Sequence, residues 1–397
     1  MIIAVAGAVK ILFDHLLDDR PEKNRPCCPI DSGPGFHYSG PMTETDGRVN
    51  ILGLTRPAFE ALAGRGGRSR ALGRLYRRAF AEGRFEPDCE AIAKETAAAL
   101  AARVALRLPA VEGVVEEEGP FGTTAKALLR LDDGQHVECV RIPVARRGPE
   151  PGPATLCVSS QVGCRMGCVF CESGLRGFVR DLRPEEIVGQ YAAARLTLGW
   201  DIGQIVFMGM GEPLDNFEGL TGALAVFLDE SGPAFSQDDI TVCTLGLPEG
   251  IARLKGLGLK RLNLSVSLNA PDEGLRGELM PASRGVGLEA LAAVLALYPQ
   301  RRNFALAVNY CLIPGRNDGP GAAEGTVAFL RAAAPSGRTV LNLIPYNPGS
   351  SPVGRAPTEA EIESFTKRLE AGGALVKLRS PRGRALMAAC GQLGRVD

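Results

Sequence analysis

The sequence has few histidines and no excess of charge of either sign. Among 397 residues only three are histidine, His15, His37 and His136, and all precede the cysteine-rich stretch around residue 168. This distribution excludes a local knuckle of three cysteines and one histidine, because a structural zinc ion needs four such ligands. The 45 basic residues balance 45 acidic ones, so any attraction to nucleic acid must come from local clusters of charge.

The sequence also lacks a typical secretion signal or membrane span. Residues 1–9 are apolar, but no basic segment precedes them, and Lys10 and Asp14 interrupt the run. Residues 19–41 contain several Pro and Gly. We expect residues 1–41 to be a disordered tail or a start-site artefact, with Met42 as the functional start. The eleven cysteines are an odd number in a large chain, which fits a reducing cytoplasm better than secretion.

Three cysteines stand close together in the run QVGCRMGCVFCESG, at Cys164, Cys168 and Cys171. Three thiolates in one loop can hold three corners of a 4Fe–4S cluster, and the fourth iron then needs a ligand from outside the protein. In radical enzymes that ligand is S-adenosylmethionine. Two alternatives fit less well, because zinc usually takes two separated pairs of ligands and unrelated thiols would be scattered. The spacing therefore predicts an open iron and chemistry at the cluster.

Residues 42–106 have the pattern of a small helical domain. Thr55-Arg56-Pro57 opens a helix with proline at an early position, and alanine-rich runs follow. The domain holds a basic cluster that includes one acidic residue, Glu82. A helix face that only contacts solvent would normally carry both basic and acidic residues. Because this cluster is almost entirely basic, we favour the interpretation that it contacts RNA. The cluster comprises Arg65, Arg68, Arg70, Arg74, Arg77, Arg78 and Arg84, with Tyr76, Phe80 and Phe85 interleaved as aromatic support.

The rest of the chain has the pattern of an α/β protein. Residues 107–150 form short alternating stretches that predict a small antiparallel β element, and residues 151–397 alternate apolar strands with helices, which predicts parallel β/α units. We expect an open (β/α)6 partial TIM barrel, since six units are too few to close a barrel of eight. Thr358 and Glu361 form a capping box that opens one of its helices. The strands are expected near residues 155–159, 204–208, 240–244, 261–267, 304–312 and 339–345, with a further one near 374–379.

Residues that can carry chemistry follow the carboxyl ends of these strands, the edge where β/α barrels build active sites. Glu212 stands on a glycine turn, Met208-Gly209-Met210-Gly211, and can accept from the ammonium of a methionine moiety. A dinucleotide fingerprint is a poor alternative, because Leu214 occupies the place of its third glycine. The cysteine loop follows the first strand, and the other strand-end residues are Gly211, Cys243, Ser267, Asn269, Asn347 and Cys390.

Several segments together resemble the radical S-adenosylmethionine (SAM) adenine methyltransferases, which modify carbon 2 of an adenosine in 23S rRNA and in some tRNAs. The segments are LCVSSQVGCRMGCVFC, MGMGEPL, SVSLNAPDEGLRGELMP, NLIPYNP and MAACGQL, and the resemblance runs from about residue 49 to the C-terminus. The chain is similar also to the sister group that methylates carbon 8. The resemblance implies one 4Fe–4S cluster per chain, two S-adenosylmethionine molecules per turnover, and an electron donor such as flavodoxin or ferredoxin. The sequence does not give the oligomeric state, and we expect a monomer.

The resemblance also implies a role for each site residue. Cys390 accepts a methyl group, whose carbon then adds to the base and links the RNA to the protein. Glu138 removes the proton from the adduct, and Cys157 attacks the Cys390 sulfur, so that product leaves as a disulfide forms. Cys164, Cys168 and Cys171 hold the cluster. The residues matched to cofactor binding are Gly211, Glu212, Cys243, Ser267, Leu268, Asn269 and Asn347. Cys27, Cys28, Cys89, Cys139 and Cys311 are interpreted as packing residues.

Three departures from the family pattern stand out. Cys243-Thr244-Leu245 replaces Ser-Thr-Ser, Ser267-Leu268-Asn269 replaces Ser-Leu-His, and SPRGR at 380–384 replaces a Thr-Arg pair. Cys and Asn can still contact a ribose or carboxylate. The alternatives are therefore a carbon 8 methyltransferase and a non-catalytic Fe–S protein that binds RNA. The RNA is expected to be single-stranded or unfolded at the target base, and to be held in part by Lys377, Arg379, Arg382 and Arg384.

Overall fold

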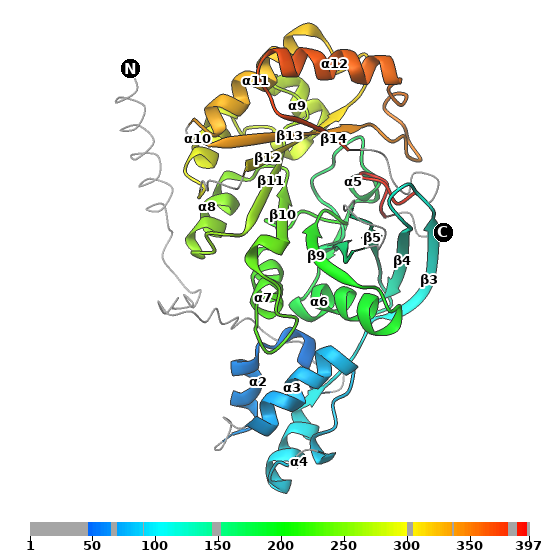
Figure 1. Cartoon of the computed structure of the whole chain (residues 1–397), viewed down its shortest axis with the longest axis vertical. Coiled ribbons are helices and arrows are strands. Elements are labelled where there is room, and N and C mark those ends of the chain that lie inside the picture. The colour runs from blue at the N-terminus through cyan, green and yellow to red at the C-terminus, as the bar shows by residue number, and fades with distance from the viewer. Residues whose placement is uncertain are drawn as a thin grey trace.

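The computed structural model describes residues 47–64, 70–89, 91–144, 152–299, 305–335, 337–379 and 387–394 (Figure 1). Within them one ten-stranded sheet runs in the order β14-β13-β12-β11-β10-β9-β6-β5-β4-β3. Its strands are β3 (Ala110–Glu117), β4 (Thr124–Arg130), β5 (His136–Ile142), β6 (Ala154–Cys157), β9 (Ile202–Phe207), β10 (Ile240–Thr244), β11 (Asn263–Ser267), β12 (Ala305–Leu312), β13 (Arg338–Pro345) and β14 (Val376–Leu378).

Strands β6 and β9 to β14 form the expected parallel barrel. Each pairs in parallel with its neighbour, and β10 coincides with the predicted strand at 240–244. Because β14 and β3 are the two edges of the sheet, the barrel does not close. The open (β/α)6 partial barrel with one further strand is confirmed.

The segment predicted as a separate β element continues the barrel sheet. β3, β4 and β5 pair antiparallel, and β5 in turn pairs antiparallel with β6, with Val140 opposite Cys157. Without β5, strand β6 would present an edge of unpaired backbone groups, which proteins generally cover. The pairing brings Glu138 of β5 close to the strand that carries Cys157.

Helices cover the outer face of the parallel strands (Figure 1). Helix α12 begins at the predicted capping box, where Thr358 and Glu361 each accept from the other's backbone, and it buries Phe365 and Leu369. The covering helices pack an apolar core against the sheet. They are α6 (Pro184–Ala192), α7 (Phe217–Phe227), α8 (Pro248–Gly256), α10 (Leu288–Ala296), α11 (Pro320–Ala333) and α12 (Glu359–Ala371).

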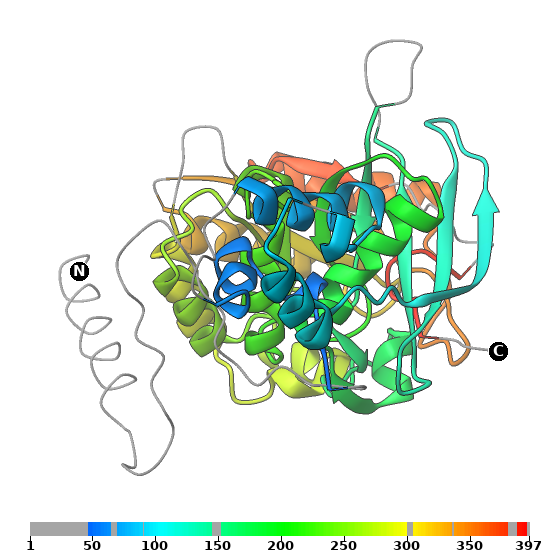
Figure 2. The same ribbon diagram turned by 90° about the horizontal axis from the view of Figure 1, so that it is seen from below.

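A small helical domain lies at one end of the sheet domain (Figure 1, Figure 2). It contains η1 (Ile51–Gly53), α2 (Arg56–Leu62), α3 (Arg70–Glu82), η2 (Pro87–Cys89) and α4 (Lys94–Arg103), with the strand pair β1 (Val49–Asn50) and β2 (Val104–Ala105). The turn η1 packs against α6 and α7. Thr55 caps α2 as predicted.

The aromatic support expected for RNA contact is wrong for two of its residues. Tyr76 and Phe80 are 0% and 2% exposed, because α3 turns its aromatic stripe toward the core and its arginines toward solvent. Tyr76 donates a hydrogen bond to the Leu54 carbonyl at 2.7 Å. Arg74 and Arg77 are exposed, while Arg65 and Arg68 lie outside the described residues.

In the described part of the chain, no helix is both long and apolar enough to cross a membrane. Residues 1–41, Met42, Arg382 and Arg384 also lie outside the described ranges.

Candidate active site

The cysteine loop is held between two short antiparallel strands, β7 (Gln161–Gly163) and β8 (Phe178–Asp181). The loop ends in the helix α5 (Glu172–Arg176). A Cβ at Gly174 would lie 2.8 Å from the Cys168 carbonyl oxygen, closer than real Cβ contacts allow, so glycine is required there. The Val169 N–H donates to the Leu279 carbonyl at 3.0 Å, which ties the loop to the segment that follows β11.

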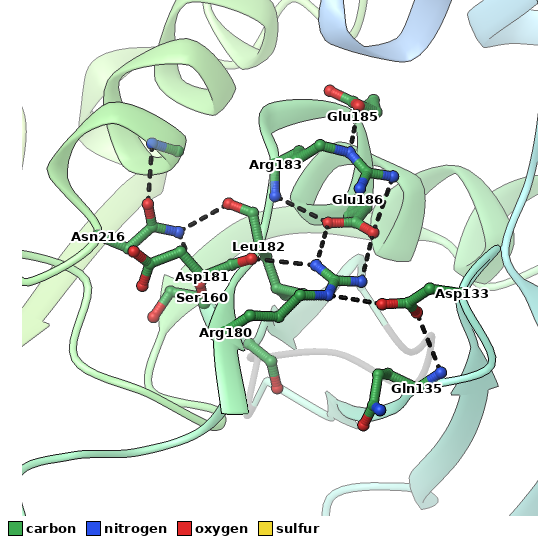
Figure 3. Close-up of polar contacts among 12 residues, drawn as sticks. Asp133, Gln135, Ser160, Arg180, Asp181, Leu182, Arg183, Glu185, Glu186 and Asn216 are labelled. Atoms are coloured by element: carbon green, nitrogen blue, oxygen red, sulfur yellow. Dashed lines mark hydrogen bonds and ion pairs between the residues drawn. The ribbon is translucent and has the colours of Figure 1, made fainter. Parts of the chain in front are cut away.

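A network of charged side chains fixes this hairpin to its surroundings (Figure 3). The Arg180 guanidinium donates two hydrogen bonds of 2.8 Å to Glu186 and one of 2.7 Å to Asp133, in the turn between β4 and β5. The Asn216 amide donates to the carbonyls of Ser160 and Leu182, both at 2.7 Å. The ends of the hairpin are therefore tied to α6, α7 and the β4–β5 turn.

The three loop thiols share one desolvated environment. Burial is the main reason that the pKa of Cys164 is raised to about 12, with a backbone hydrogen bond at Met166 opposing the rise and the neighbouring Cys171 adding to it. Burial likewise raises the pKa of Cys168 and of Cys171. Such thiols gain stability as thiolates only when a metal neutralises them. In the described part of the chain no three Cys, His, Asp or Glu side chains lie together as ligands of a single ion.

This arrangement fits a cluster better than a zinc ion. Zinc needs all its sulfurs about 2.3 Å from one centre, whereas each thiolate of a 4Fe–4S cluster binds a different iron, which spreads the sulfurs apart. An apolar wall surrounds the loop, as expected for a site that controls solvent access. It is formed by Met166, Leu245, Ala270, Leu279, Met280, Ile313 and Tyr346.

The glycine turn after β9 places Glu212 beside the loop. Gly211 has φ +96°, and a Cβ there would lie 2.5 Å from the Gln161 Cβ, so the turn needs glycine. Glu212 is 4% exposed. Its carboxylate accepts from the backbone N–H of Leu245 at 2.7 Å and of Leu214 at 3.1 Å. Burial nevertheless outweighs these hydrogen bonds and raises the pKa of Glu212 to about 7.

A ladder of polar side chains crosses the carboxyl ends of β10 to β14. The Asn309 amide donates to Cys243 Sγ at 3.1 Å and its oxygen accepts from Asn342 at 2.8 Å. Arg379 Nε donates to Asn342 at 3.0 Å. Ser267 Oγ lies 4.0 Å from Cys243 Sγ. The predicted residues Cys243 and Ser267 thus belong to one network, and sequence reasoning missed Asn309 and Asn342.

The remaining predicted cofactor residues also lie at the carboxyl edge of the parallel strands, but they differ in burial and in hydrogen bonding. Asn269 has φ +58°, and its side-chain oxygen accepts from the Cys311 N–H at 2.8 Å. Leu268 is fully buried, and its backbone N–H donates to the Asn309 carbonyl at 3.0 Å. Asn347 is 4% exposed, and its side-chain oxygen has no hydrogen-bond partner among the described residues. A buried unpaired acceptor of this kind is consistent with a ligand contact.

The segment that carries Cys390 is fastened to α5, immediately after Cys171 (Figure 1). The Glu172 N–H donates to the Gly391 carbonyl at 2.8 Å, and Ser173 Oγ donates to the Leu393 carbonyl at 2.6 Å. Cys390 is at the surface of the described chain, yet surrounding protein raises the pKa of its thiol, against the opposing effect of Arg379. The cysteine loop and the segment that carries Cys390, the predicted methyl carrier, are therefore joined directly by hydrogen bonds.

Glu138 and Cys157 lie beside this segment. Glu138 is 1% exposed, forms an ion pair with Lys126 at 2.7 Å and accepts from the Gly394 N–H. Burial raises the pKa of Cys157 well above its usual range, and the nearby Cys390 thiol adds to the effect.

The structure thus brings the predicted site residues to one edge of the sheet. Sequence reasoning missed Lys126, Arg276 and Cys311 at this edge. The pKa of Cys311 is raised by burial first, and then by nearby Cys390 and Cys171. Lys126 lies two strands away from Cys157 in the sheet, and nothing in the residues around it in the sequence indicates that it pairs with Glu138.

Comparison with known proteins agrees with this geometry. Residues 158–322 match the radical SAM superfamily. The dual-specificity RNA methyltransferase RlmN of Syntrophobacter fumaroxidans is 37% identical over 350 residues, covering 87% of this chain and 98% of that protein. The probable RlmN of Rhodopirellula baltica is 43% identical over 275 residues, covering 68% and 71%.

A solved structure has a similar fold. The crystal structure of a radical SAM methyltransferase from Sphaerobacter thermophilus has a TM-score of 0.75 and 32% identity, and the match covers 89% of this chain and 99% of that one. With a relative matched over nearly its whole length and the site residues assembled as described, the chain belongs to the family of the radical SAM dual-specificity RNA methyltransferases.

Proposed function

We propose that this enzyme methylates carbon 2 of an adenosine in 23S rRNA, and also in tRNA, through a methyl group carried on Cys390. The observation that carries the proposal is the convergence of Cys390, Cys157 and Glu138 at one edge of the sheet, beside the cysteine loop. The relatives named dual-specificity RNA methyltransferases add support for both kinds of RNA.

Cys164, Cys168 and Cys171 would hold one 4Fe–4S cluster, and with S-adenosylmethionine this cluster supplies the radical chemistry that an electron-poor carbon requires. The chain's own residues do the rest. Cys390 takes the methyl group on its sulfur and, after the carbon has joined the base, keeps the RNA attached. Glu138 receives the proton that leaves the methylated carbon. Cys157 then loses its thiol proton and forms a disulfide with Cys390; the electron pair of the broken carbon–sulfur bond stays on the carbon, which takes up a proton to become the methyl group.

The surroundings of these residues support their roles. Glu138 is fixed by two donors, Lys126 and the Gly394 N–H, so its carboxylate is oriented before substrate arrives. The apolar wall around the loop keeps water from reactive intermediates. Gly211, Glu212, Cys243, Ser267, Leu268, Asn269 and Asn347 would contact S-adenosylmethionine, of which each turnover uses two molecules.

The exposed arginines of α3 and the stretch from Lys377 to Arg384 would bind the RNA backbone. We place the enzyme in the cytoplasm, where its RNA substrates and a reductant such as flavodoxin or ferredoxin are found, and propose that it acts as a monomer. The test is mass spectrometry of nucleosides from the 23S rRNA and tRNA of cells with and without the gene. Loss of 2-methyladenosine on deletion supports the proposal. Loss of 8-methyladenosine would instead identify a carbon 8 methyltransferase, and no change would indicate a non-catalytic protein.

A further inference from the structure

The cysteine loop carries two exposed aliphatic side chains at its C-terminal end. Leu175, in α5, is 46% exposed, and Val179, in β8, is 49% exposed. The Leu175 N–H donates to the Cys171 carbonyl at 3.0 Å, and the Gly177 carbonyl accepts from the Cys164 N–H at 2.9 Å. Both exposed side chains therefore lie within two residues of backbone groups that bond directly to predicted cluster ligands.

Two arginines accompany these aliphatic residues. Arg176, the last residue of α5, is exposed and pairs with no carboxylate in the described part of the chain. Arg165 places its guanidinium 3.7 Å from the centroid of the Phe178 ring, and its charge is largely balanced by Asp215 at 2.7 Å and Asp181 at 4.0 Å. The surface formed by Leu175, Arg176 and Val179, called here the α5–β8 surface, thus combines apolar side chains with one uncompensated positive charge.

The position of the α5–β8 surface distinguishes it from an ordinary stretch of protein surface. Single exposed aliphatic side chains are common and need no explanation. These two, however, lie on the loop of the proposed cluster, which must receive an electron from outside the protein. An electron donor that docked here would place its redox group close to that cluster.

RNA is a less suitable occupant of the α5–β8 surface. Proteins bind nucleic acid mainly through cationic side chains on the phosphates and aromatic side chains on the bases, whereas the exposed apolar residues here are aliphatic. In addition, the exposed arginines proposed to bind RNA are on α3, and Figure 1 shows α3 well away from α5. A protein docked on α5 would therefore leave the arginines of α3 uncovered.

We propose that the α5–β8 surface docks an acidic, flavin-carrying electron-transfer protein. The inference rests on the cluster assigned under the proposed function. In the complex the reduced flavin gives up one electron and the cluster accepts it, with no atom transferred. A flavin whose apolar ring edge is exposed within an acidic rim matches aliphatic side chains beside an arginine. Electron-transfer complexes are among the smallest protein interfaces, below about 1,200 Å², so a small surface is sufficient.

Binding of flavodoxin to the holoenzyme provides the first test. Anaerobically reconstituted wild type, Arg176→Glu and the double variant Leu175→Ser with Val179→Ser are titrated with flavodoxin by isothermal calorimetry at low salt. We expect each variant to bind about tenfold more weakly than wild type, as for loss of a central interface contact. Added salt should weaken binding by wild type more than binding by Arg176→Glu. Wild-type affinity in either variant would overturn the proposal.

Reduction of the cluster provides the second test. The loss of visible absorption on reduction is followed by stopped-flow spectroscopy, with either reduced flavodoxin or dithionite as the electron donor. At subsaturating flavodoxin, both variants should be reduced about tenfold more slowly than wild type. Dithionite is a small ion that needs no docked protein, so it should reduce all three proteins at the same rate. Equal slowing with both donors would show damage to the cluster site and would overturn the docking role.

Two control variants match the test variants in exposure and contacts. Arg331 is an exposed arginine that donates to the Gly372 carbonyl at 2.7 Å, as Arg176 does to the Gly394 carbonyl at 3.1 Å. Leu297, after α10, is 40% exposed. Arg331→Glu and Leu297→Ser should bind flavodoxin as wild type does, and equal weakening in these controls would overturn the assignment to the α5–β8 surface. Iron content and thermal unfolding temperature establish that each variant is folded and loaded. If the double variant does not fold, Arg176→Glu decides the matter.

RNA binding and failure of the proposed function give different outcomes. If the α5–β8 surface bound RNA, the variants would lose affinity for a fragment of 23S rRNA and keep their affinity for flavodoxin, which would overturn the proposal. A wild type that binds no flavodoxin would reject the docking surface alone. A wild type that accepts an electron from flavodoxin but produces no 2-methyladenosine would reject the proposed function and leave the docking result intact.

Discussion

Lys126 and Glu138 form a buried ion pair across adjacent strands, with Nζ and Oε1 2.7 Å apart. The same ammonium donates to the Met387 carbonyl at 3.2 Å, and the same carboxylate accepts from Gly394 N–H. The pair therefore reaches both ends of the segment that carries Cys390. Both side chains of the pair therefore help to fix the position of Cys390.

Removing Lys126 should destabilise the protein. Lys126→Met leaves the Glu138 carboxylate buried without its cation, and breaking a buried pair of this type costs about 3–5 kcal/mol. The double variant Lys126→Met with Glu138→Gln should lose less, because no charge remains uncompensated. Urea unfolding measures both. Lys367→Met is the matched control, since Lys367 and Glu363 form an exposed pair worth at most about 1 kcal/mol. Equal losses in the two single variants would contradict this reasoning.

Replacing Cys157 should trap the RNA on the protein. Cys157→Ala cannot form the disulfide that releases product, so a covalent RNA adduct should accumulate through Cys390. Cys390→Ala should give neither adduct nor product. Denaturing gel electrophoresis with labelled RNA detects the adduct. Cys139→Ala changes another fully buried thiol of the same region and should turn over normally. Normal turnover by Cys157→Ala would mean that another group resolves the adduct.

The affinity for S-adenosylmethionine should depend on pH through Glu212. Its pKa is raised to about 7 by burial, so at lower pH the side chain is neutral and accepts an ammonium poorly. Affinity should rise by up to about tenfold per pH unit as pH approaches 7, then fall above about pH 8 as the ligand's amino group loses its proton. Equilibrium dialysis between pH 5.5 and 8.5 measures the curve. Glu212→Gln should bind weakly and show no rise below pH 7.

Substituting Gly211 should disrupt the turn that carries Glu212. Gly211 has φ +96°, and an alanine Cβ would lie 2.8 Å from the Gln161 backbone nitrogen. Gly211→Ala should cost about 1–3 kcal/mol of stability and lower the affinity for S-adenosylmethionine. Gly256→Ala is the matched control, because a Cβ there meets nothing within 4 Å. That variant should be neutral or gain up to about 1 kcal/mol. Unfolding midpoints that do not separate the two variants would refute the prediction.

Local patterns in the sequence were enough to predict much of the fold. The spacing of Cys164, Cys168 and Cys171 and the residues that end each parallel strand lie within short windows, and the parallel order of the sheet then brings them together. The Thr358 capping box is local for the same reason. Each of these features depends on the spacing of residues that are close together in the sequence, so it can be identified without the structure.

Contacts between distant residues could not be predicted in this way. Arg276 looks like any helical arginine until α9 (Glu273–Leu279) buries it against Leu245, and Lys126 looks like a surface residue until the Cys390 segment covers it. The pairing of β5 with β6 is equally non-local. Tyr76 and Phe80 were misinterpreted because interleaved aromatic and basic residues suit both an RNA-binding surface and an amphipathic helix.

The attachment of the Cys390 segment to α5 has a consequence for how the enzyme assembles. Hydrogen bonds from Glu172 and Ser173 hold this tail directly beyond Cys171, the last of the three predicted cluster ligands. The proposed cluster site and the proposed methyl carrier, Cys390, therefore depend on the same five-residue helix. We expect protein made without the cluster to lose order in the cysteine loop and in the Cys390 segment together. Insertion of the cluster should restore both segments.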